Sequence, residues 1–136
     1  MMRADPYLFF QGRCAEAFEF YRKTLGAEIE LLVRFGDVPG FRPETKDNVM
    51  HAALRIGETV VLASDGRASE NAKFSGFSLS LQVADDAEAE RQFAGLADGG
   101  AIEERLMSTP FASRFGKVVD RFGTPWMIVT QQQPTR

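Results

Sequence analysis

Residues 114–129 read RFGKVVDRFGTPWMIV, and this stretch predicts a hairpin that closes a β-sheet. Lys117 to Val119 is typical of the end of a strand. Asp120 to Gly123 predicts a tight turn, because Asp suits the first turn position and Gly supplies a positive φ. Pro125 to Thr130 predicts the returning strand, since proline is tolerated at the first residue of a strand. Alternation along that strand assigns Trp126 to the core.

The totals are those of one ordinary globular domain. The 136 residues are 44% hydrophobic and 26% charged, with a net charge of −3, and such a chain can bury a sizeable core. The mixed charges argue against nucleic acid or an anionic membrane as the main partner. No apolar run reaches the roughly 18 residues that a membrane span needs. The single cysteine excludes an internal disulfide and, with no apolar leader, predicts a cytoplasmic protein.

The first half of the chain predicts the order β-α-β-β-β. Apolar residues recur at helical spacing from Cys14 to Leu25, and Gly26 is a suitable helix end. Gly57 and Glu58 predict a two-residue turn between two strands. The predicted elements are a strand at 6–10, a helix at 13–25, a strand at 27–35, a long loop at 36–48, and strands at 49–56 and 59–64.

The second half repeats this order after a polar linker. Asp85 and Glu88 have the spacing of a capping box at a helix start, and Gly99 and Gly100 end that helix. The strand–helix offsets give a period of about 73 residues, and such self-similarity indicates two copies of one structural unit. Strands are predicted at 77–83, 101–107, 113–119 and 125–130. We therefore expect a single domain at 1–136, with module one at 6–65, a linker at 66–76, module two at 77–130 and a polar tail at 131–136.

With both halves in view, the chain resembles the vicinal-oxygen-chelate superfamily, which includes glyoxalase I, bleomycin- and fosfomycin-resistance proteins and extradiol dioxygenases. It looks closest to the PhnB-like branch, whose members are labelled demethylubiquinone methyltransferase-like. The resemblance implies an α+β fold in which paired β-α-β-β-β modules form curled mixed sheets around a cavity, assembled as a homodimer. The motifs that carry it are PYLFF at 6–10, AFEFY at 17–21, VMHA at 49–52, RFG at 114–116, DRFG at 120–123 and WM at 126–127.

The resemblance also indicates where metal-using relatives hold their ion, in the first and last strands of each module. Those positions fall near Pro6, Val61 or Leu62, Ser78 and Met127. A divalent ion needs nitrogen, carboxylate or thiolate donors, and none of these residues is His, Glu or Asp. The sequence also lacks a glycine-rich loop that opens a helix after a strand, as a nucleotide-type cofactor would require. We therefore expect neither a bound metal nor a cofactor.

Strand parity indicates which side chains face a cavity instead of the helices. A few polar groups on an apolar concavity are typical of a small-molecule site. Half of the side chains of any sheet point away from its helices, so ordinary solvent exposure is an equally good interpretation. The predicted pocket residues are Phe10, Arg34, His51, Arg55, Ser78, Ser80, Gln82 and Met127.

His51 is the only histidine and the one weak catalytic candidate, as a general base or a ligand-anchoring donor. Because the sequence reveals no catalytic partner, a satisfied polar residue in a sheet is the simpler interpretation. Cys14 lies on the apolar stripe of the first helix and is expected to be a buried small hydrophobe. Asp120 and Asp65 are explained by their turn and loop positions.

The resulting hypothesis is a PhnB-like protein that binds or transforms a small organic molecule, apolar or aromatic, in a metal-free cavity. Two alternatives stay open at this point. One is a metal-dependent lyase or dioxygenase of the same superfamily, with His51 as one ligand. The other is a non-catalytic interaction module with a vestigial cavity. The residues do not decide whether any reaction is catalysed.

Overall fold

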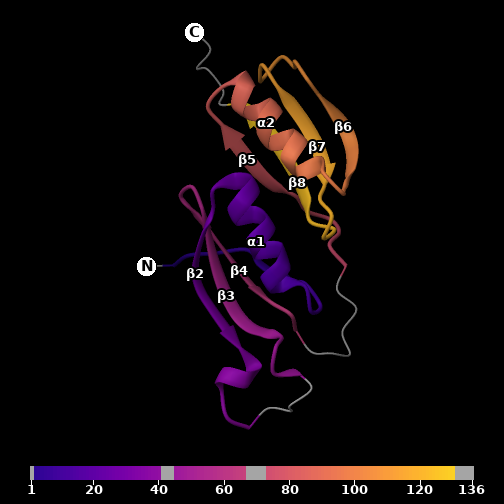
Figure 1. Cartoon of the computed structure of the whole chain (residues 1–136). Helices are drawn as coiled ribbons and strands as arrows, with labels where there is room; N and C mark the ends of the chain where they lie inside the picture. The colour runs from indigo at the N-terminus through magenta and orange to yellow at the C-terminus, as the bar shows by residue number, and fades with distance from the viewer. Residues whose placement is uncertain (1, 41–44, 67–72, 131–136) are drawn as a thin grey trace. The chain divides into compact units, whose positions relative to one another are not determined.

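The structure is a computed structural model of the chain, and it describes residues 2–40, 45–66 and 73–130. The described residues form two α-helices and eight strands in two four-stranded mixed sheets (Figure 1). The chain divides into two compact units, unit one at Met1–Ala72 and unit two at Lys73–Arg136, each with the order β-α-β-β-β. The α+β class and the doubled pattern are therefore confirmed. Parts of the predicted loop and linker and the whole predicted tail lie outside the described residues, and the domain boundaries stay a prediction.

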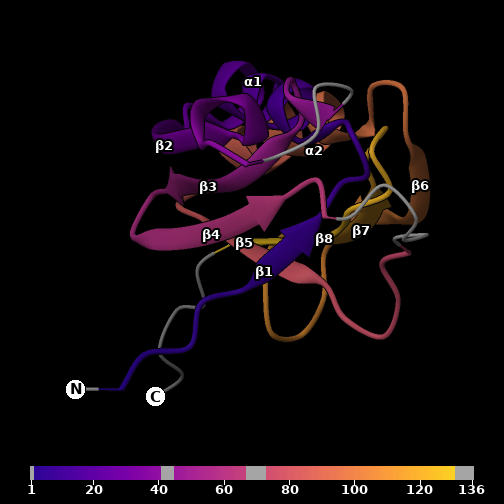
Figure 2. The same cartoon turned by 90° about the horizontal axis from the view of Figure 1, so that it is seen from below.

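The elements of unit one are β1 at Tyr7–Phe9, α1 at Cys14–Leu25, β2 at Glu28–Arg34, a short 3-10 helix η1 at Phe35–Asp37, β3 at Val49–Ile56 and β4 at Thr59–Ser64. The strand order in the sheet is β1-β4-β3-β2. β1 runs parallel to β4, and the other neighbours are antiparallel. α1 lies on one side of this sheet (Figure 2), so the opposite side of the same strands is not covered by a helix of unit one.

Helix α1 forms because its apolar residues share one face. Cys14, Ala17, Phe18 and Tyr21 are at most 2% exposed. Gly26 follows the last turn with a φ of 69°, a left-handed conformation that glycine adopts without strain. Within the described residues, no helix is long and apolar enough to cross a membrane.

A buried carboxylate fastens the start of α1 to the sheet. Asp65, directly after β4, is 3% exposed. Its Oδ1 accepts hydrogen bonds from the backbone N–H groups of Gly12 and Cys14, each at 2.8 Å, and its Oδ2 accepts one from Val49 at 2.7 Å. Because the first N–H groups of a helix have no partner within the helix, a carboxylate there both satisfies them and complements their partial positive charge. Asp65 is thus a structural residue, as its loop position predicts.

The elements of unit two are β5 at Leu79–Val83, α2 at Asp86–Ala97, β6 at Ala101–Met107, β7 at Phe115–Val119 and β8 at Pro125–Thr130, with strand order β5-β8-β7-β6. The predicted cap of α2 is present, since Asp85 accepts a hydrogen bond from the Glu88 N–H at 2.9 Å. The Glu88 carboxylate accepts the N–H of Ala84 at 3.3 Å, one residue before the N-cap.

Asp120 organises the hairpin between β7 and β8. Its Oδ1 accepts the N–H groups of Phe122 at 2.8 Å and Thr124 at 3.1 Å. Its Oδ2 accepts the indole N–H of Trp126 at 2.8 Å. Asp120 is 3% exposed and Trp126 is 2% exposed, so the whole arrangement is buried. The predicted turn and the assignment of Trp126 to the core are confirmed.

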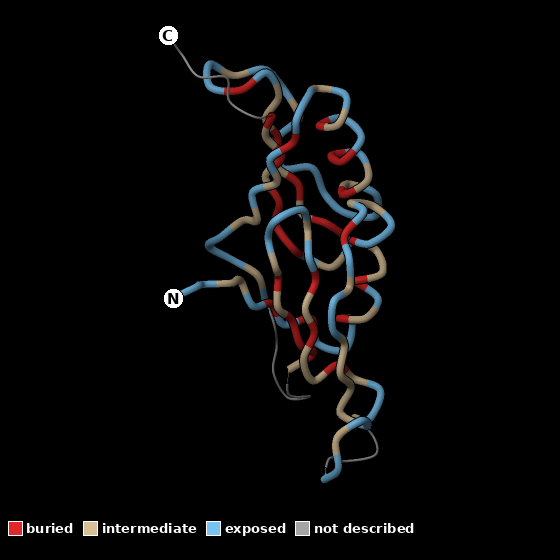
Figure 3. Tube along the Cα trace, turned by 90° about the vertical axis from the view of Figure 1, so that its left-hand side faces the viewer, coloured by how far each residue is buried: buried red, intermediate tan, exposed pale blue. Residues whose placement is uncertain are grey.

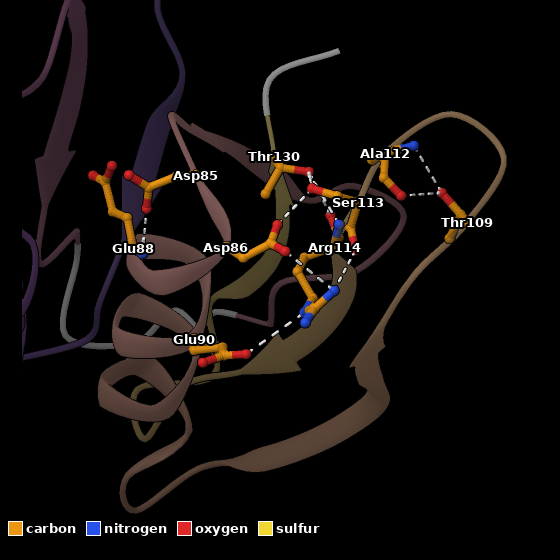
Figure 4. A network of polar contacts seen from close by, with 9 residues as sticks. All are labelled: Asp85, Asp86, Glu88, Glu90, Thr109, Ala112, Ser113, Arg114 and Thr130. Carbon is orange, nitrogen blue, oxygen red and sulfur yellow. Dashed lines mark hydrogen bonds and ion pairs between the residues drawn. The ribbon is translucent and has the colours of Figure 1, made fainter. Parts of the chain in front are cut away.

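Arg114 ties the start of β7 to the start of α2, as Figure 4 shows. Its guanidinium lies 3.3 Å from the carboxylate of Asp86 and 3.6 Å from that of Glu90. Ser113 donates a hydrogen bond to Asp86 and is hydrogen-bonded to the hydroxyl of Thr130 at 2.9 Å. Because these side chains are partly exposed, each ion pair contributes at most about 1 kcal/mol to stability. Arg114, at the start of the motif at 114–129, is thus explained by its structural ion pairs and needs no catalytic role.

Candidate functional site

The side of the first sheet that faces away from α1 is largely apolar, and we call it the open face. Burial alternates along the strands (Figure 3). Ala52 and Leu54 of β3 are fully buried, and their partners in β4, Ala63 and Val61, are buried as well. Side chains of the other parity make up the open face. Its residues, connected by the strand register, are Tyr7, Phe9, Leu31, Val33, His51, Ala53, Leu62 and Ser64.

Three large apolar side chains of the open face are unusually exposed. Tyr7 is 40% exposed, Phe9 43% and Leu31 45%. The rings of Tyr7 and Phe9 lie with their centroids 5.1 Å apart. Scattered exposed apolar residues are normal on a protein surface, but a contiguous group of them marks an interaction or ligand site. The open face therefore has the apolar part of a binding surface.

One polar pair lies within this apolar face. The hydroxyl of Tyr7 is 3.0 Å from Nδ1 of His51, and the two ring centroids are 5.7 Å apart. Tyr7 reaches His51 across β4, which separates β1 from β3 in the sheet. Sequence analysis selected His51 without a partner, and the structure supplies one.

Tyr7 keeps its proton in this environment. Burial raises the pKa of its phenol above the ordinary value, the nearby Cys14 also raises it, and a side-chain hydrogen bond with Ser64 lowers it by less. The net direction of the pKa is upward, so the hydroxyl is neutral near pH 7 and can donate a hydrogen bond. Tyr7 is thus a neutral phenol that can hold the imidazole of His51 in place to orient a polar group of a ligand.

Arg55 shares the parity of His51, as predicted, but two carboxylates engage it. Its guanidinium donates to Glu30 at 3.1 Å and also forms an ion pair with Glu28. The two glutamates belong to β2, next to β3. Arg55 lies four residues from His51, about 13 Å along the strand. Arg55 therefore lies at one end of the open face, bound to these two glutamates, and does not contact the Tyr7–His51 pair.

Two predicted pocket residues do not reach the open face. Phe10 is 5% exposed and packs on the α1 side, with ring centroids 6.3 Å from Phe18 and 6.4 Å from Tyr21. Strand parity could have shown this, because Phe10 has the same parity as the buried Leu8. Phe10 belongs to the core of unit one.

Arg34 leaves the predicted face because of an irregularity in the strand pairing. The register shifts between Val33 and Arg34, so that Val33 lies opposite His51 and Arg34 lies opposite the fully buried Val49. A one-residue shift exchanges the two faces of a strand. The charge of Arg34 lowers the pKa of Cys14, which places it near the start of α1. Val33, not Arg34, accompanies His51.

The remaining predicted residues lie in unit two. Ser80 pairs with Met127 across β5 and β8, and Gln82 pairs with Val129. Trp126 and Ile128 of the other parity are buried, so the predicted division of faces holds here. Ser78 precedes β5 and is partly exposed. Ser80, Gln82 and Met127 thus share one face of the second sheet.

Cys14 is a buried structural residue, as predicted. Its exposure is 0%, and burial, followed by the charge of Asp65, raises the pKa of the thiol to about 12. A nucleophilic cysteine needs the opposite, an accessible thiol with a lowered pKa. Cys14 is therefore not part of a reactive site.

The donor groups present do not fit a divalent metal ion. Across residues 2–40, 45–66 and 73–130, no group of three or more His, Cys, Asp or Glu side chains could hold one. Tyr7 and His51 together offer one imidazole nitrogen and a neutral phenol, whereas the usual zinc site has three or four nitrogen, sulfur or carboxylate ligands. The Tyr7–His51 pair therefore lacks the ligand set of a zinc site.

Tyr7 is the residue of the candidate site that the sequence did not single out. Its position next to the buried Leu8 assigns it to the open face by parity alone. Its contact with His51, however, joins residues 44 positions apart and depends on the parallel pairing of β1 with β4. No local pattern in the sequence encodes that pairing.

The chain is similar to known proteins over almost its whole length. The family model described as 3-demethylubiquinone-9 3-methyltransferase matches residues 3–129. Protein YjdN of Escherichia coli (strain K12) is 39% identical over 147 aligned residues, which cover 99% of this chain and 100% of that protein.

Solved structures share the fold. Protein PA1353 from Pseudomonas aeruginosa has a TM-score of 0.89 and 40% identity, covering 98% of this chain and 100% of that one. The PhnB protein from Bacillus cereus has a TM-score of 0.83 and 28% identity, covering 96% and 100%. The fosfomycin resistance protein FosX from Mesorhizobium loti, at 12% identity, has a TM-score of 0.66 with 96% and 92% covered, and this shows likeness of fold alone.

Proposed function

Because the chain belongs to the PhnB-like family described as 3-demethylubiquinone-9 3-methyltransferase, within the vicinal-oxygen-chelate superfamily, we propose that it binds a small organic molecule on the open face of its first sheet. Methyl transfer is not part of the proposal, since the sequence lacks the glycine-rich loop that a nucleotide-type cofactor requires. The proposed binding needs no bound metal and includes no chemical reaction.

The observation that carries the proposal is the Tyr7–His51 pair inside an exposed apolar face. Ligand sites combine a mainly apolar lining with a few polar groups that fix orientation. Here the rings of Tyr7 and Phe9 with Leu31 and Leu62 supply the apolar lining. His51 supplies the polar group, held by the Tyr7 hydroxyl at 3.0 Å. What distinguishes this face is that three large apolar side chains, each 40% exposed or more, lie on it together with the polar pair.

Thermal shift with a library of small aromatic and aliphatic compounds tests the proposal. A ligand that binds only the folded state adds about 2.7 kcal/mol of stability at a hundred times its Kd. Compounds that raise the Tm are then titrated against the variant Phe9→Ala. We expect this variant to keep the Tm of the unliganded protein within a few degrees and to lose most of the ligand-induced shift.

Phe111→Ala is the matched control. Phe111 is 47% exposed, compared with 43% for Phe9, and its ring centroid lies 5.4 Å from that of Phe115, compared with 5.1 Å between Tyr7 and Phe9. Phe111 belongs to unit two and lies in the loop between β6 and β7. If both variants lose the ligand-induced shift equally, or if no compound raises the Tm, binding at the open face is wrong.

A further inference from the structure

We infer that the Tyr7 hydroxyl fixes the imidazole of His51 as a hydrogen-bond donor through Nε2, so that the open face selects flat apolar molecules carrying a carbonyl or carboxylate oxygen. This inference rests on the proposed binding function and gives it a ligand class. It follows from three features of the open face: the 3.0 Å contact at Nδ1, the apolar neighbours of His51, and the paired aromatic rings.

The first feature decides the tautomer of the imidazole. A neutral imidazole has one nitrogen that donates and one that accepts, and the hydrogen bond made by one nitrogen sets the role of the other. The hydroxyl of Tyr7 lies 3.0 Å from Nδ1 of His51. With the protonated phenol of Tyr7 as the donor, Nδ1 is the acceptor of this contact. The remaining proton of the neutral ring is then on Nε2.

The second feature concerns what can accept the Nε2 proton. Val33 is the cross-strand neighbour of His51 on the open face and has no polar side-chain atom. Leu62 and Ala53, which pair with each other in the next row, have none either. Ser64, a polar side chain of the same face, is 5% exposed, donates to the Val49 carbonyl at 3.2 Å and accepts the Gly66 N–H at 2.9 Å. A ligand oxygen that replaces water at Nε2 would therefore meet a donor among mainly apolar side chains, where a hydrogen bond is strong and its loss is costly.

The third feature defines the rest of the ligand. The rings of Tyr7 and Phe9 are inclined by 36° with centroids 5.1 Å apart, and both are more than a third exposed. Flat apolar groups contact such rings well, by offset stacking or edge-to-face packing. An aromatic molecule with one oxygen acceptor can pack against these rings and accept a hydrogen bond from Nε2 of His51. A ligand whose polar group can only donate would meet the donor at Nε2 and be disfavoured.

The tautomer can be measured without any ligand. The chain has one histidine, so the imidazole signals of ¹⁵N-labelled protein arise from His51 alone. Near pH 8, long-range ¹H–¹⁵N spectra should show a protonated Nε2 and an unprotonated Nδ1 that accepts a hydrogen bond. In Tyr7→Phe, the hydrogen-bond shift of Nδ1 should disappear while the fold is kept. A proton on Nδ1 in the parent protein would overturn the inference and leave the proposed binding function intact.

Ligand selection is tested with four probes of one shape: 2-naphthoate, 2-acetonaphthone, 2-isopropylnaphthalene and 2-(aminomethyl)naphthalene. We expect the two oxygen-bearing probes to bind about 2- to 10-fold more tightly than the hydrocarbon, as one net hydrogen bond allows. The amine should bind most weakly. Equal affinity for all four would contradict this inference alone, whereas absence of binding by all four and by the wider library would contradict the proposed function as well.

Variants of His51 test whether its side chain acts as the hydrogen-bond donor to the ligand oxygen. His51→Gln places an amide N–H near the position of Nε2 and should keep the preference for oxygen-bearing probes. His51→Leu has similar bulk without a donor, and should lose the 2- to 10-fold preference for the oxygen-bearing probes over the hydrocarbon. If the glutamine variant behaves like the leucine variant, or if the leucine variant keeps the preference, Nε2 is not the anchoring donor. His51 is only partly buried, and circular dichroism checks that each variant folds.

Discussion

Replacing Asp120 tests the interpretation of the hairpin that dominates the sequence. Its carboxylate accepts three hydrogen bonds: from the N–H of Phe122 at 2.8 Å, from the N–H of Thr124 at 3.1 Å and from the indole of Trp126 at 2.8 Å. Asp120→Ala removes both acceptor oxygens, and with them all three hydrogen bonds, from a site that is 3% exposed. Each buried donor left without a partner costs about 1–3 kcal/mol.

The expected loss is smaller than three full penalties. Phe122 is partly exposed, so water can reach its N–H, whereas Thr124 and Trp126 are at most 2% exposed. We therefore expect Asp120→Ala to lower the free energy of unfolding by about 3–5 kcal/mol, a large part of the 5–15 kcal/mol typical of a domain. Asp120→Asn keeps one oxygen for the two backbone N–H groups but turns an amide donor toward the indole, and should cost about 1.5–3 kcal/mol.

Urea denaturation followed by circular dichroism and by fluorescence provides the measurement. Trp126 is the only tryptophan, so fluorescence reports on this hairpin directly. Asp98→Asn is the matched control, because Asp98 makes an exposed ion pair with Arg121 at 3.1 Å, and such pairs contribute at most about 1 kcal/mol. A loss below about 1 kcal/mol for Asp120→Ala, or an equal loss in the control, would refute the assignment of Asp120 as the buried acceptor of the turn.

Four further predictions concern Cys14, Gly116, metal binding and the oligomeric state. Cys14 has no exposure, and its pKa is raised from 9.0 to about 12, so its thiol should react with a disulfide reagent only in denaturant. The pKa of Cys14 is higher in the folded than in the unfolded chain. The stability that the neutral thiol contributes below pH 9 should therefore be lost as the pH rises toward 12. Gly116→Ala should destabilise by about 1–3 kcal/mol in urea denaturation, because the new Cβ would lie 2.7 Å from Cε2 of Phe93 and 3.1 Å from Leu106. Added zinc, nickel or manganese at micromolar concentration should leave the Tm unchanged, and elemental analysis should find less than about one metal per ten chains; a chelator-reversible rise in Tm would favour a metal-dependent enzyme. Light scattering should give the mass of a homodimer, since the exposed edge strand β6 leaves backbone groups to be covered, and a monomer mass would contradict this.

Local patterns predicted most of the fold. The strands at 49–56, 59–64, 101–107 and 125–130 begin and end as predicted, because turn residues border each of them. The predicted strand at 113–119 begins two residues later, at Phe115, since Ser113 bonds to the start of α2. The strand predicted at 6–10 is reduced to Tyr7–Phe9, because Phe10 turns into the core.

The site was harder to predict than the fold, for physical reasons. Alternation along one strand indicated that His51 and Arg55 share a face, and the register confirms it. Arg34 was misplaced because a register shift between β2 and β3 leaves no trace in the sequence pattern. The Tyr7–His51 contact could not be predicted from the sequence, because it depends on β1, β4 and β3 becoming neighbours in the sheet. Pairing of distant segments is a property of the whole sheet.

The parallel pairing of β1 with β4 also sets an order of events during folding. Tyr7 pairs with Leu62, far along the chain, whereas β3 and β4 are joined by a turn at Gly57 and Glu58. Closing a long loop costs more entropy than closing a hairpin, and contacts between distant residues slow folding. On a ribosome, Tyr7 leaves the exit tunnel early but has to wait for β4 before it can dock. We therefore expect the two aromatic side chains of β1 to join the open face only after the β3–β4 hairpin has formed.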